Sequence, residues 1–389
     1  MKVTIFADLK AEKRVSMDVY SDNLFKHLVK IYSAENNFSL FRGPEYSSPI
    51  SILVERVLDN SSFLGKRISR YIVYTMSAKK NKSEINHITD HGYAFLLHFL
   101  NPKNTIVTCH DLIPLVMDGM YGRTALSPLG NKTYKYILSG ILKAKKVIAV
   151  SESTKRDLIK YLKCNEENII VVYSGVDSRF KKENELGHLE EIKRKYNLPD
   201  SKYLLHVGNC NWYKNIPGIL HSLKMLLSKD IDIILIKVGE QFTKEQKELI
   251  NKLGLNERIY HLGLLSDEEL ISVYNLASVL IYPSIYEGFG FPVLEAMACG
   301  TPIVASKVAS LPEIVDRAAL LVDPNSSKEI FEAIYGILSN NDLRVSLISQ
   351  GLRRAEIFTW EKTAEQTFKI YEEIFASVRS SANLGPLLS

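Results

Sequence analysis

Residues 278–306 constrain the fold of this chain more than any other segment. The apolar run SVLIYPS predicts a buried strand, the loop Gly288-Phe289-Gly290 follows it, and Pro292 opens an apolar helix. Gly300 ends that helix shortly before a second strand at 303–305. Strand, glycine loop, helix and strand in this order are typical of an open parallel sheet, in which ligands lie at the carboxyl ends of the strands.

The alternation of strands and helices continues along the whole chain and predicts an α/β fold with helices on both faces of parallel sheets. A chain of 389 residues is long for one hydrophobic core and suits two domains. The charged segment 178–200 reads as a partly helical linker between two alternating series. The strands expected in the first series are 3–9, 103–111, 145–151 and 168–174, and those in the second are 202–208, 233–238, 258–263, 279–282, 303–305 and 319–322.

Composition points to a cytoplasmic protein. The four cysteines are scattered without a CxxC pair, as expected of a chain kept reduced. The N-terminal residues run directly into a strand pattern, so we expect no signal peptide. No uncharged apolar run reaches the roughly 18 residues of a membrane-spanning helix.

Positive charge is concentrated in the first half of the chain. Residues 1–180 hold 26 Lys and Arg against 17 Asp and Glu, a net charge of +9, whereas the remainder carries −4. Residues 63–82 form an apolar stripe with basic edges at helical spacing, which suits either a helix on an anionic membrane or a surface helix packed on the core. Nucleic acid is not expected, because no binding motif accompanies the charge. The basic residues of the segment are Lys66, Arg67, Arg70, Lys79, Lys80 and Lys82.

Two glutamates and a lysine are the main site candidates in the second half. Glu287 and Glu295 stand eight positions apart and can bind the paired hydroxyls of a sugar and of a ribose, or can be solvated surface groups. The helix start at 290–293 can offer amides to a phosphate. Lys214 follows a strand and precedes a helix, where it can bring a positive charge to the same ligand or remain an exposed turn lysine.

Histidine and aspartate residues mark a candidate site in the first half. His110 and Asp111 follow a strand, so His110 can face a ligand or be a structural histidine, and Asp111 can cap the next turn. His87 and His91 do not suit a metal site, because the strand-like start of this segment keeps them off one helix; His87 is a candidate acceptor-side group. The literal DxD at 230–232 opens a buried strand and is not expected to hold a cation.

These segments together resemble the retaining glycosyltransferases of family 4, which have the GT-B fold. The resemblance rests on YEGFGFPVLEAMACGTPIVAS around the two glutamates, with VTCHDLIP, KKVIAVSESTKRDL, IIVVYSGVD and LLHVGNCNWYKN before it. It implies two Rossmann-like domains that face a central cleft, with the C-terminal helix crossing back to the first. We therefore expect an acceptor-binding domain at 1–177, joined by the helix at about 361–389, and a nucleotide-sugar-binding domain at 178–360.

The resemblance also assigns roles to residues. Lys214 would bind the donor diphosphate, Glu295 the ribose and Glu287 the sugar near the reacting carbon, with His110 as a further catalytic group. Other donor-binding candidates surround them: Gly208, Asn209, Gly288, Phe289, Gly290, Phe291, Pro292 and Val293. The acceptor side is expected to include His87, Asp111, Ser16 and Asp18.

The chain departs from the family in two places. Many members carry an arginine where this chain has Asn209, so either Lys214 and the helix amides suffice or another basic residue substitutes. Many also carry a Gly-Gly turn after the first strand, but residues 1–42 contain no glycine, so that loop is built differently.

The sequence therefore predicts a retaining, metal-independent hexosyltransferase without a cofactor. The expected reaction moves mannose from GDP-mannose to a glycan or lipid-linked acceptor in surface polysaccharide synthesis, such as that of lipopolysaccharide. The protein would work in the cytoplasm, with peripheral contact at the inner face of the cytoplasmic membrane as one alternative. The competing interpretations are a GT-B sugar-nucleotide epimerase and a non-catalytic protein that binds sugar nucleotides.

Overall fold

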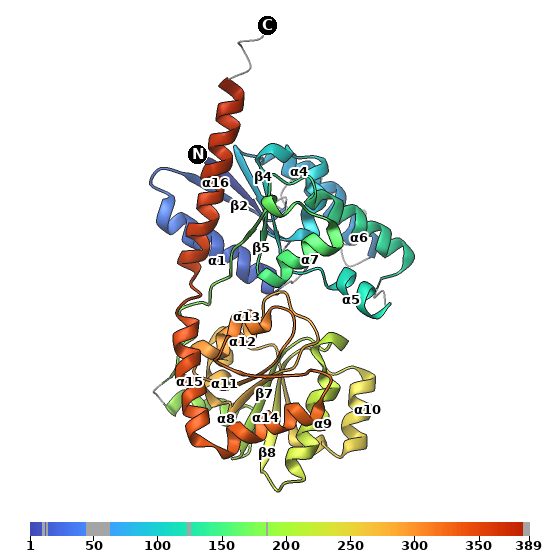
Figure 1. Ribbon diagram of the computed structural model, residues 1–389, viewed down its shortest axis with the longest axis vertical. Helices are drawn as coiled ribbons and strands as arrows, with labels where there is room; N and C mark the ends of the chain where they lie inside the picture. The colour runs from blue at the N-terminus through green and yellow to red at the C-terminus, as the bar shows by residue number, and fades with distance from the viewer. Residues whose placement is uncertain (10–11, 13–14, 44–62, 123–125, 184–185, 384–389) are drawn as a thin grey trace. The chain divides into compact units, whose positions relative to one another are not determined.

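The computed structural model describes residues 1–9, 12, 15–43, 63–122, 126–183 and 186–383. The chain divides into two compact units, each built around its own parallel sheet (Figure 1). Unit 1 combines Met1–Gly175 with Trp360–Ser389, and unit 2 is Val176–Thr359. The α/β architecture expected from the sequence is therefore confirmed.

The sheet of unit 1 has the strand order β2-β1-β3-β4-β5-β6, and all its pairings are parallel. The central strands are almost wholly apolar or buried, as expected of strands covered on both faces. Its strands are β1 (Lys2–Phe6), β2 (Asn37–Phe41), β3 (Ile85–Ile88), β4 (Thr105–Cys109), β5 (Lys146–Ala149) and β6 (Ile169–Val171).

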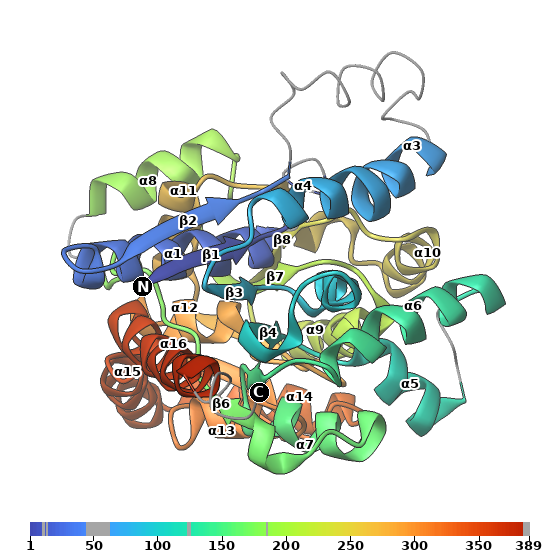
Figure 2. The same cartoon turned by 90° about the horizontal axis from the view of Figure 1, so that it is seen from above.

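Helices cover both faces of this sheet. Helices α1 and α16 run beside each other on one side, and α4 and α6 lie on the other (Figure 2). The helical segments of unit 1 are α1 (Val15–Tyr32), α3 (Phe63–Ile68), the π-helical turn η2 (Ser69–Val73), α4 (Tyr74–Lys80), the 3₁₀ segment η3 (His91–His98), α5 (Ile113–Tyr121), α6 (Pro128–Ile141), α7 (Glu152–Leu162) and α16 (Trp360–Asn383).

The sheet of unit 2 has the order β12-β11-β10-β7-β8-β9, again with parallel pairings throughout. The order reverses between β7 and β10, because the chain moves from β7 toward β8 and from β10 toward β11. The strands are β7 (Lys202–Gly208), β8 (Ile233–Gly239), β9 (Ile259–Gly263), β10 (Val279–Tyr282), β11 (Ile303–Ser306) and β12 (Leu320–Val322).

Apolar side chains from the helices of unit 2 pack on this sheet. Helices α9, α10 and α14 contribute Leu223, Ile250 and Ile334 to one buried cluster with the strands. The helices of this unit are α8 (Leu186–Lys195), the 3₁₀ turn η6 (Trp212–Lys214), α9 (Ile216–Leu227), α10 (Lys244–Leu253), α11 (Asp267–Leu276), α12 (Phe291–Ala298), α13 (Leu311–Val315), α14 (Ser327–Ser339) and α15 (Asn341–Ala355).

Side chains cap the start of two helical segments. Ser266 and Glu269 form a capping box at the start of α11. The side chain of Asp90 accepts from the Gly92 amide at the start of η3. Within the described residues, no helix is both long and apolar enough to cross a membrane.

The segment 63–82 contains both buried and exposed apolar side chains. Its core-facing residues include Val73, Tyr74 and Ala78, whereas Ile72 and Met76 are 54% and 48% exposed. Of the two alternatives left open by the sequence, packing on the core therefore does not account for Ile72 and Met76. A π-helical turn lies between α3 and α4 and shifts the helix register there.

Candidate functional site

The loops after β7 and β10 meet at the point where the strand order of unit 2 reverses. At such a point neighbouring loops diverge to opposite faces of a parallel sheet and leave room for a ligand. Strand β7 ends at Gly208, the loop after it carries Lys214, and the loop after β10 carries Glu287. Their backbones are joined, since the amide of Ile285 donates to the Tyr213 carbonyl at 2.7 Å.

Lys214 and Glu287 form a buried ion pair at this point. The Lys214 Nζ donates to Glu287 Oε1 at 2.6 Å and to the Tyr282 hydroxyl at 2.8 Å. Burial lowers the pKa of Lys214, but the charge of Glu287 and these hydrogen bonds outweigh burial and raise the pKa above its usual value. Lys214 is therefore charged at every physiological pH.

Asn215 sets the position of Lys214. Its backbone is left-handed (φ 56°), and its side chain caps α9 by accepting from the Gly218 amide. The same side chain donates to the carbonyls of Pro283 and Pro324, which follow β10 and β12. One asparagine therefore ties three loops of the carboxyl edge together.

The glycine loop before α12 is bound by the side chain of Ser310. The Ser310 hydroxyl lies near the carbonyls of Glu287 and Phe289, at 3.0 and 3.1 Å, and is buried. Gly290 has φ 104°, and a Cβ there would lie 2.8 Å from the Leu311 side chain. Glycine is therefore required for the conformation, and Ser310 is a contributor that the sequence motifs did not reveal.

The helix start offers fewer amides than the sequence analysis assumed. Pro292 has no amide hydrogen, and the amide of Val293 donates to the Gly290 carbonyl at 3.0 Å. The expectation of an anion site from the whole 290–293 segment is therefore wrong for these two residues. Neither of these two residues can therefore offer an amide to an anion.

Glu295 lies further along α12 and has a different partner. Its Oε2 accepts from the Tyr274 hydroxyl at 2.7 Å. Burial raises the pKa of Glu295 to about 7, against the opposing effect of the Tyr274 hydrogen bond. The structure therefore gives the two glutamates separate environments: Glu287 is paired with a cation, whereas Glu295 has a neutral hydroxyl.

The turn after β7 contains the remaining donor-side candidates. Gly208 has φ 144°, and a Cβ built on it would lie 4.0 Å from Lys214 Nζ. Asn209 accepts a hydrogen bond from the Asn211 amide, which closes the turn. Phe289 is buried and meets the Phe291 ring edge-on, at 5.3 Å between centroids.

In unit 1, His110 directly follows β4, and its side chain is buried. Its Nε2 lies 2.7 Å from the Thr89 carbonyl and therefore donates to it, and Tyr20 meets the ring edge-on. Burial lowers the pKa of His110, so the ring is neutral at pH 7. Asp111 caps the start of α5 by accepting from the Ile113 amide.

His87 belongs to the core of unit 1 rather than to an accessible surface. Its side chain is fully buried, with Nδ1 2.6 Å from the Tyr371 hydroxyl and Nε2 2.8 Å from the Thr108 hydroxyl. Burial lowers the pKa of His87 to about 3. Both ring nitrogens are hydrogen-bonded, so this imidazole connects β3, β4 and α16. The acceptor-side role expected from the sequence does not fit this position.

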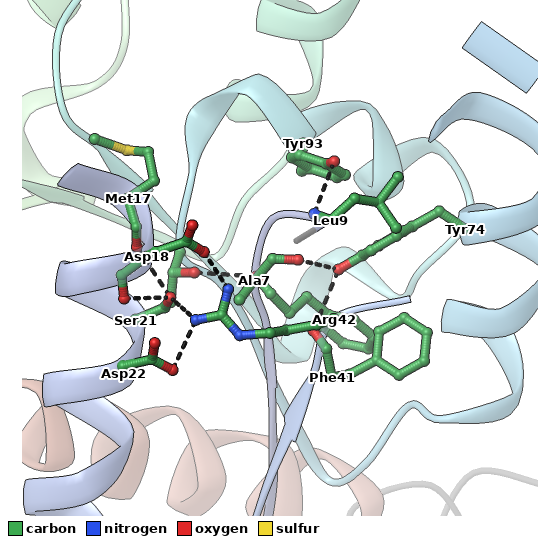
Figure 3. A network of polar contacts seen from close by, with 12 residues as sticks. Ala7, Leu9, Met17, Asp18, Ser21, Asp22, Phe41, Arg42, Tyr74 and Tyr93 are labelled. Carbon is green, nitrogen blue, oxygen red and sulfur yellow. Dashed lines mark hydrogen bonds and ion pairs between the residues drawn. The ribbon is translucent and has the colours of Figure 1, made fainter. Parts of the chain in front are cut away.

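Asp18 is engaged in a charge network beside the end of β1 (Figure 3). Arg42 forms ion pairs with Asp18 and Asp22 and donates to the Ser21 hydroxyl. In the same view the Tyr74 hydroxyl donates to the Ala7 carbonyl at 2.6 Å. Asp18 therefore anchors α1 to β2.

Ser16 lies near the start of α1 and is exposed.

The described residues contain no group of three His, Cys, Asp or Glu side chains arranged to hold a metal ion. The DxD segment precedes β8 and so lies at the amino edge of the sheet, opposite the edge that carries Lys214. Asp232 pairs there with Arg258 at 2.5 Å.

Comparison with known proteins gives a consistent assignment. The family model "Glycosyl transferases group 1" matches residues 189–354, and "Glycosyltransferase Family 4" matches residues 27–180. The O-antigen chain mannosyltransferase B of Escherichia coli is 32% identical over 286 residues, which are 72% of this chain and 73% of the relative. The serotype-specific mannosyltransferase WbdA of Escherichia coli is 27% identical over 282 residues, or 71% of this chain, and the match spans only 34% of that longer relative.

Solved structures agree on the fold. The sucrose-phosphate synthase of Thermosynechococcus elongatus has a TM-score of 0.75 at 21% identity, over 97% of this chain and 100% of the other. Anabaena HepE, solved in complex with UDP and glucose, has a TM-score of 0.72 at 16% identity, over 96% and 99%. With its two parallel-sheet units and its similarity to the mannosyltransferase of O-antigen chains, this chain belongs to the group 1 glycosyltransferases and has the GT-B fold.

Proposed function

We propose that this protein is a retaining hexosyltransferase that uses a nucleotide-diphosphate sugar without a metal ion. The observation that carries the proposal is the buried Lys214–Glu287 pair at the point where the strand order of unit 2 reverses. Departure of the diphosphate leaves positive charge on the sugar ring and negative charge on the phosphate. A lysine and a carboxylate side by side can stabilise both.

The roles of the individual groups follow from their surroundings. Lys214 and the amide of Gly290 would bind the diphosphate, and Glu295 would accept hydrogen bonds from the ribose. Glu287 would bind hydroxyls of the sugar. Its Oε1 already accepts from Lys214, which makes it a weak nucleophile, so attack by the acceptor hydroxyl on the face that the diphosphate leaves is favoured over a covalent intermediate.

We take mannose from GDP-mannose as the donor group and a glycan or lipid-linked chain of a surface polysaccharide as the acceptor. The two Escherichia coli relatives, a serotype-specific mannosyltransferase and an O-antigen chain mannosyltransferase, support mannose and O-antigen chains. HepE, in contrast, was solved with UDP and glucose, so the base and sugar require a direct test.

The test is transfer by the purified protein from radiolabelled GDP-mannose, UDP-glucose and ADP-glucose, with and without a lipid-linked oligosaccharide acceptor. We expect acceptor-dependent transfer from GDP-mannose with the α-configuration retained, as read by proton NMR of the product. Release or isomerisation of the donor sugar without an acceptor would instead indicate an epimerase. No binding or turnover of any of these donors would refute the proposal.

Unit 1 supplies a surface suited to an anionic membrane, at the inner face of the cytoplasmic membrane. Exposed Ile72 and Met76 lie in the segment that carries four exposed lysines. Arg70 does not contribute, since it pairs with Glu12 at 3.2 Å and donates to the Gly92 carbonyl. The exposed lysines are Lys66, Lys79, Lys80 and Lys82.

Sedimentation with vesicles of anionic and of neutral lipid tests this surface. Each basic residue near an anionic surface contributes about 1 kcal/mol, so we expect binding at low salt that declines as salt screens it. Replacing the four lysines by glutamate should abolish binding. Equal binding to neutral vesicles, or no effect of the replacements, would contradict the proposal.

A further inference from the structure

Lys237 is a charged side chain buried inside the sheet of unit 2. It interrupts the apolar strand β8, and its side chain is 0% exposed. Its Nζ donates to the Gly208 carbonyl at 2.6 Å and to the Val238 carbonyl at 2.8 Å. Within the part of the chain that the structure describes, no carboxylate pairs with it. An unpaired ammonium in such a place is costly and marks a candidate functional residue.

The contact fixes the turn in which β7 ends. A Cβ on Gly239 would lie 2.3 Å from the Gly208 carbonyl oxygen, so only glycine leaves room for that carbonyl to reach Lys237. A trans peptide directs its amide opposite to its carbonyl, so the Asn209 amide points away from Lys237. Lys214 lies within 4.0 Å of the Cβ position of Gly208. Gly208 therefore lies between the ammonium groups of Lys214 and Lys237 and accepts a hydrogen bond from Lys237.

The two lysines at this edge of the sheet differ in how their charge is compensated. Lys214 is paired with Glu287, whereas the charge of the exposed Glu240, directly after β8, acts on Lys237 without an ion pair between them. The neighbouring His206 adds no positive charge: burial, and after it the charge of Lys237, lower the pKa of His206 to about 3. A diphosphate bound at the turn would add a counter-charge on the side of the turn that faces away from Lys237.

We propose that Lys237 is a positioning residue for the donor diphosphate: it holds the Gly208 carbonyl inside the sheet and makes the turn after β7 electropositive. This inference rests on the proposed function, since it assumes that a nucleotide-diphosphate sugar binds at this edge. Lys237 acts through the turn and through its field, and it does not itself touch the ligand.

Binding of GDP, UDP, guanosine and uridine to the wild-type protein, Lys237→Met and Lys237→Gln tests the proposal by calorimetry. We expect Lys237→Met to weaken binding of the preferred diphosphate by roughly tenfold to a hundredfold at low salt, and to leave the nucleoside unaffected. Lys237→Gln keeps a donor for Gly208 but loses the charge, so it separates positioning from charge. Lys202→Met, at the exposed start of β7, is the matched control and should bind like the wild type.

Thermal unfolding provides a second measurement, in which Lys237→Met is not expected to show the loss that it shows in diphosphate binding. Because an unpaired buried charge opposes folding, we expect Lys237→Met to melt at or above the wild-type temperature although it binds the diphosphate less well. Unchanged diphosphate affinity in both variants, or equal losses for nucleoside and diphosphate, would leave Lys237 a purely structural residue. If the wild type bound neither GDP nor UDP, the proposed function would fail instead.

Discussion

Lys214 and Glu287, which are 73 positions apart in the chain, share a buried hydrogen bond of 2.6 Å. Removing one partner of such a pair leaves the other charge buried without compensation, which costs about 3–5 kcal/mol. We expect Lys214→Met and Glu287→Gln each to be destabilised by that order of magnitude in urea unfolding and to lose transfer activity. The double variant should recover most of the stability but none of the activity.

The exposed pair of Lys193 and Glu190, at 3.0 Å, provides the control for this cycle. Its loss should cost less than about 1 kcal/mol. Additive losses in the Lys214 and Glu287 double variant would show that the two charges do not stabilise each other. Activity retained by Glu287→Gln would remove its carboxylate from the reaction.

Glu295 should make nucleotide binding depend on pH. Its raised pKa of about 7 means that below this pH the carboxyl is increasingly protonated, and a protonated carboxyl is a poorer acceptor for ribose hydroxyls. We expect nucleoside affinity to fall up to tenfold per pH unit below 7, and Glu295→Gln to remove this dependence. Guanosine and uridine are the suitable ligands, because they carry no titrating phosphate.

The same shift affects stability. When a carboxyl has a higher pKa in the folded state than in the unfolded state, the protein becomes less stable as the pH rises from the unfolded pKa near 4.5 through the folded pKa of about 7. Glu295→Gln should therefore be more stable than the wild type at pH 8, by at most about 3 kcal/mol, and not at pH 4. A constant difference across this range would refute the raised pKa.

His87 should matter for the stability of unit 1. In His87→Ala the buried hydroxyl of Tyr371 loses its bond to the imidazole, and an unsatisfied group costs about 1–3 kcal/mol, whereas the Thr108 hydroxyl keeps that of Tyr20 as a partner. We expect a lower melting temperature and, in the fraction that remains folded, normal donor and acceptor KM values. A raised acceptor KM at unchanged stability would restore the acceptor-side role.

Activity should survive an excess of EDTA. The carboxylates of the DxD segment lie at the amino edge of β8, and Asp232 is paired with Arg258. Asp230→Asn and Asp232→Asn should therefore retain transfer within about twofold. Loss of activity in EDTA with rescue by manganese would contradict a metal-independent reaction.

The sequence predicts the second sheet better than the first. Each strand of unit 2 is an apolar run between turn residues, and all six are found where expected. In unit 1, β2 was missed because it is an edge strand with half-exposed residues and lacks an apolar run. For the segment at 63–82 the sequence left two alternatives open, because periodicity assumes a uniform helix and does not reveal the π-helical turn that breaks the register.

For the candidate site, the motifs identify residues but not their contacts. Lys214 and Glu287 were assigned to different parts of the donor, and no spacing along the chain could predict that they pair. Ser310 lies outside the motif and contacts it only by donating to the backbone carbonyls of Glu287 and Phe289. The position of Lys237 could have been noticed in the sequence, because a lysine within the run IILIKVG is unusual for a buried strand.

The discontinuity of unit 1 has a consequence for how the protein emerges from the ribosome. Helix α16 is made after all of unit 2, yet it supplies Tyr371 to His87 and places Trp360 against Tyr20. Part of the apolar surface of the first sheet therefore remains uncovered until about 180 further residues of unit 2 have been synthesised. Unit 2, although it comes second along the chain, is the first unit to have all its parts available for folding.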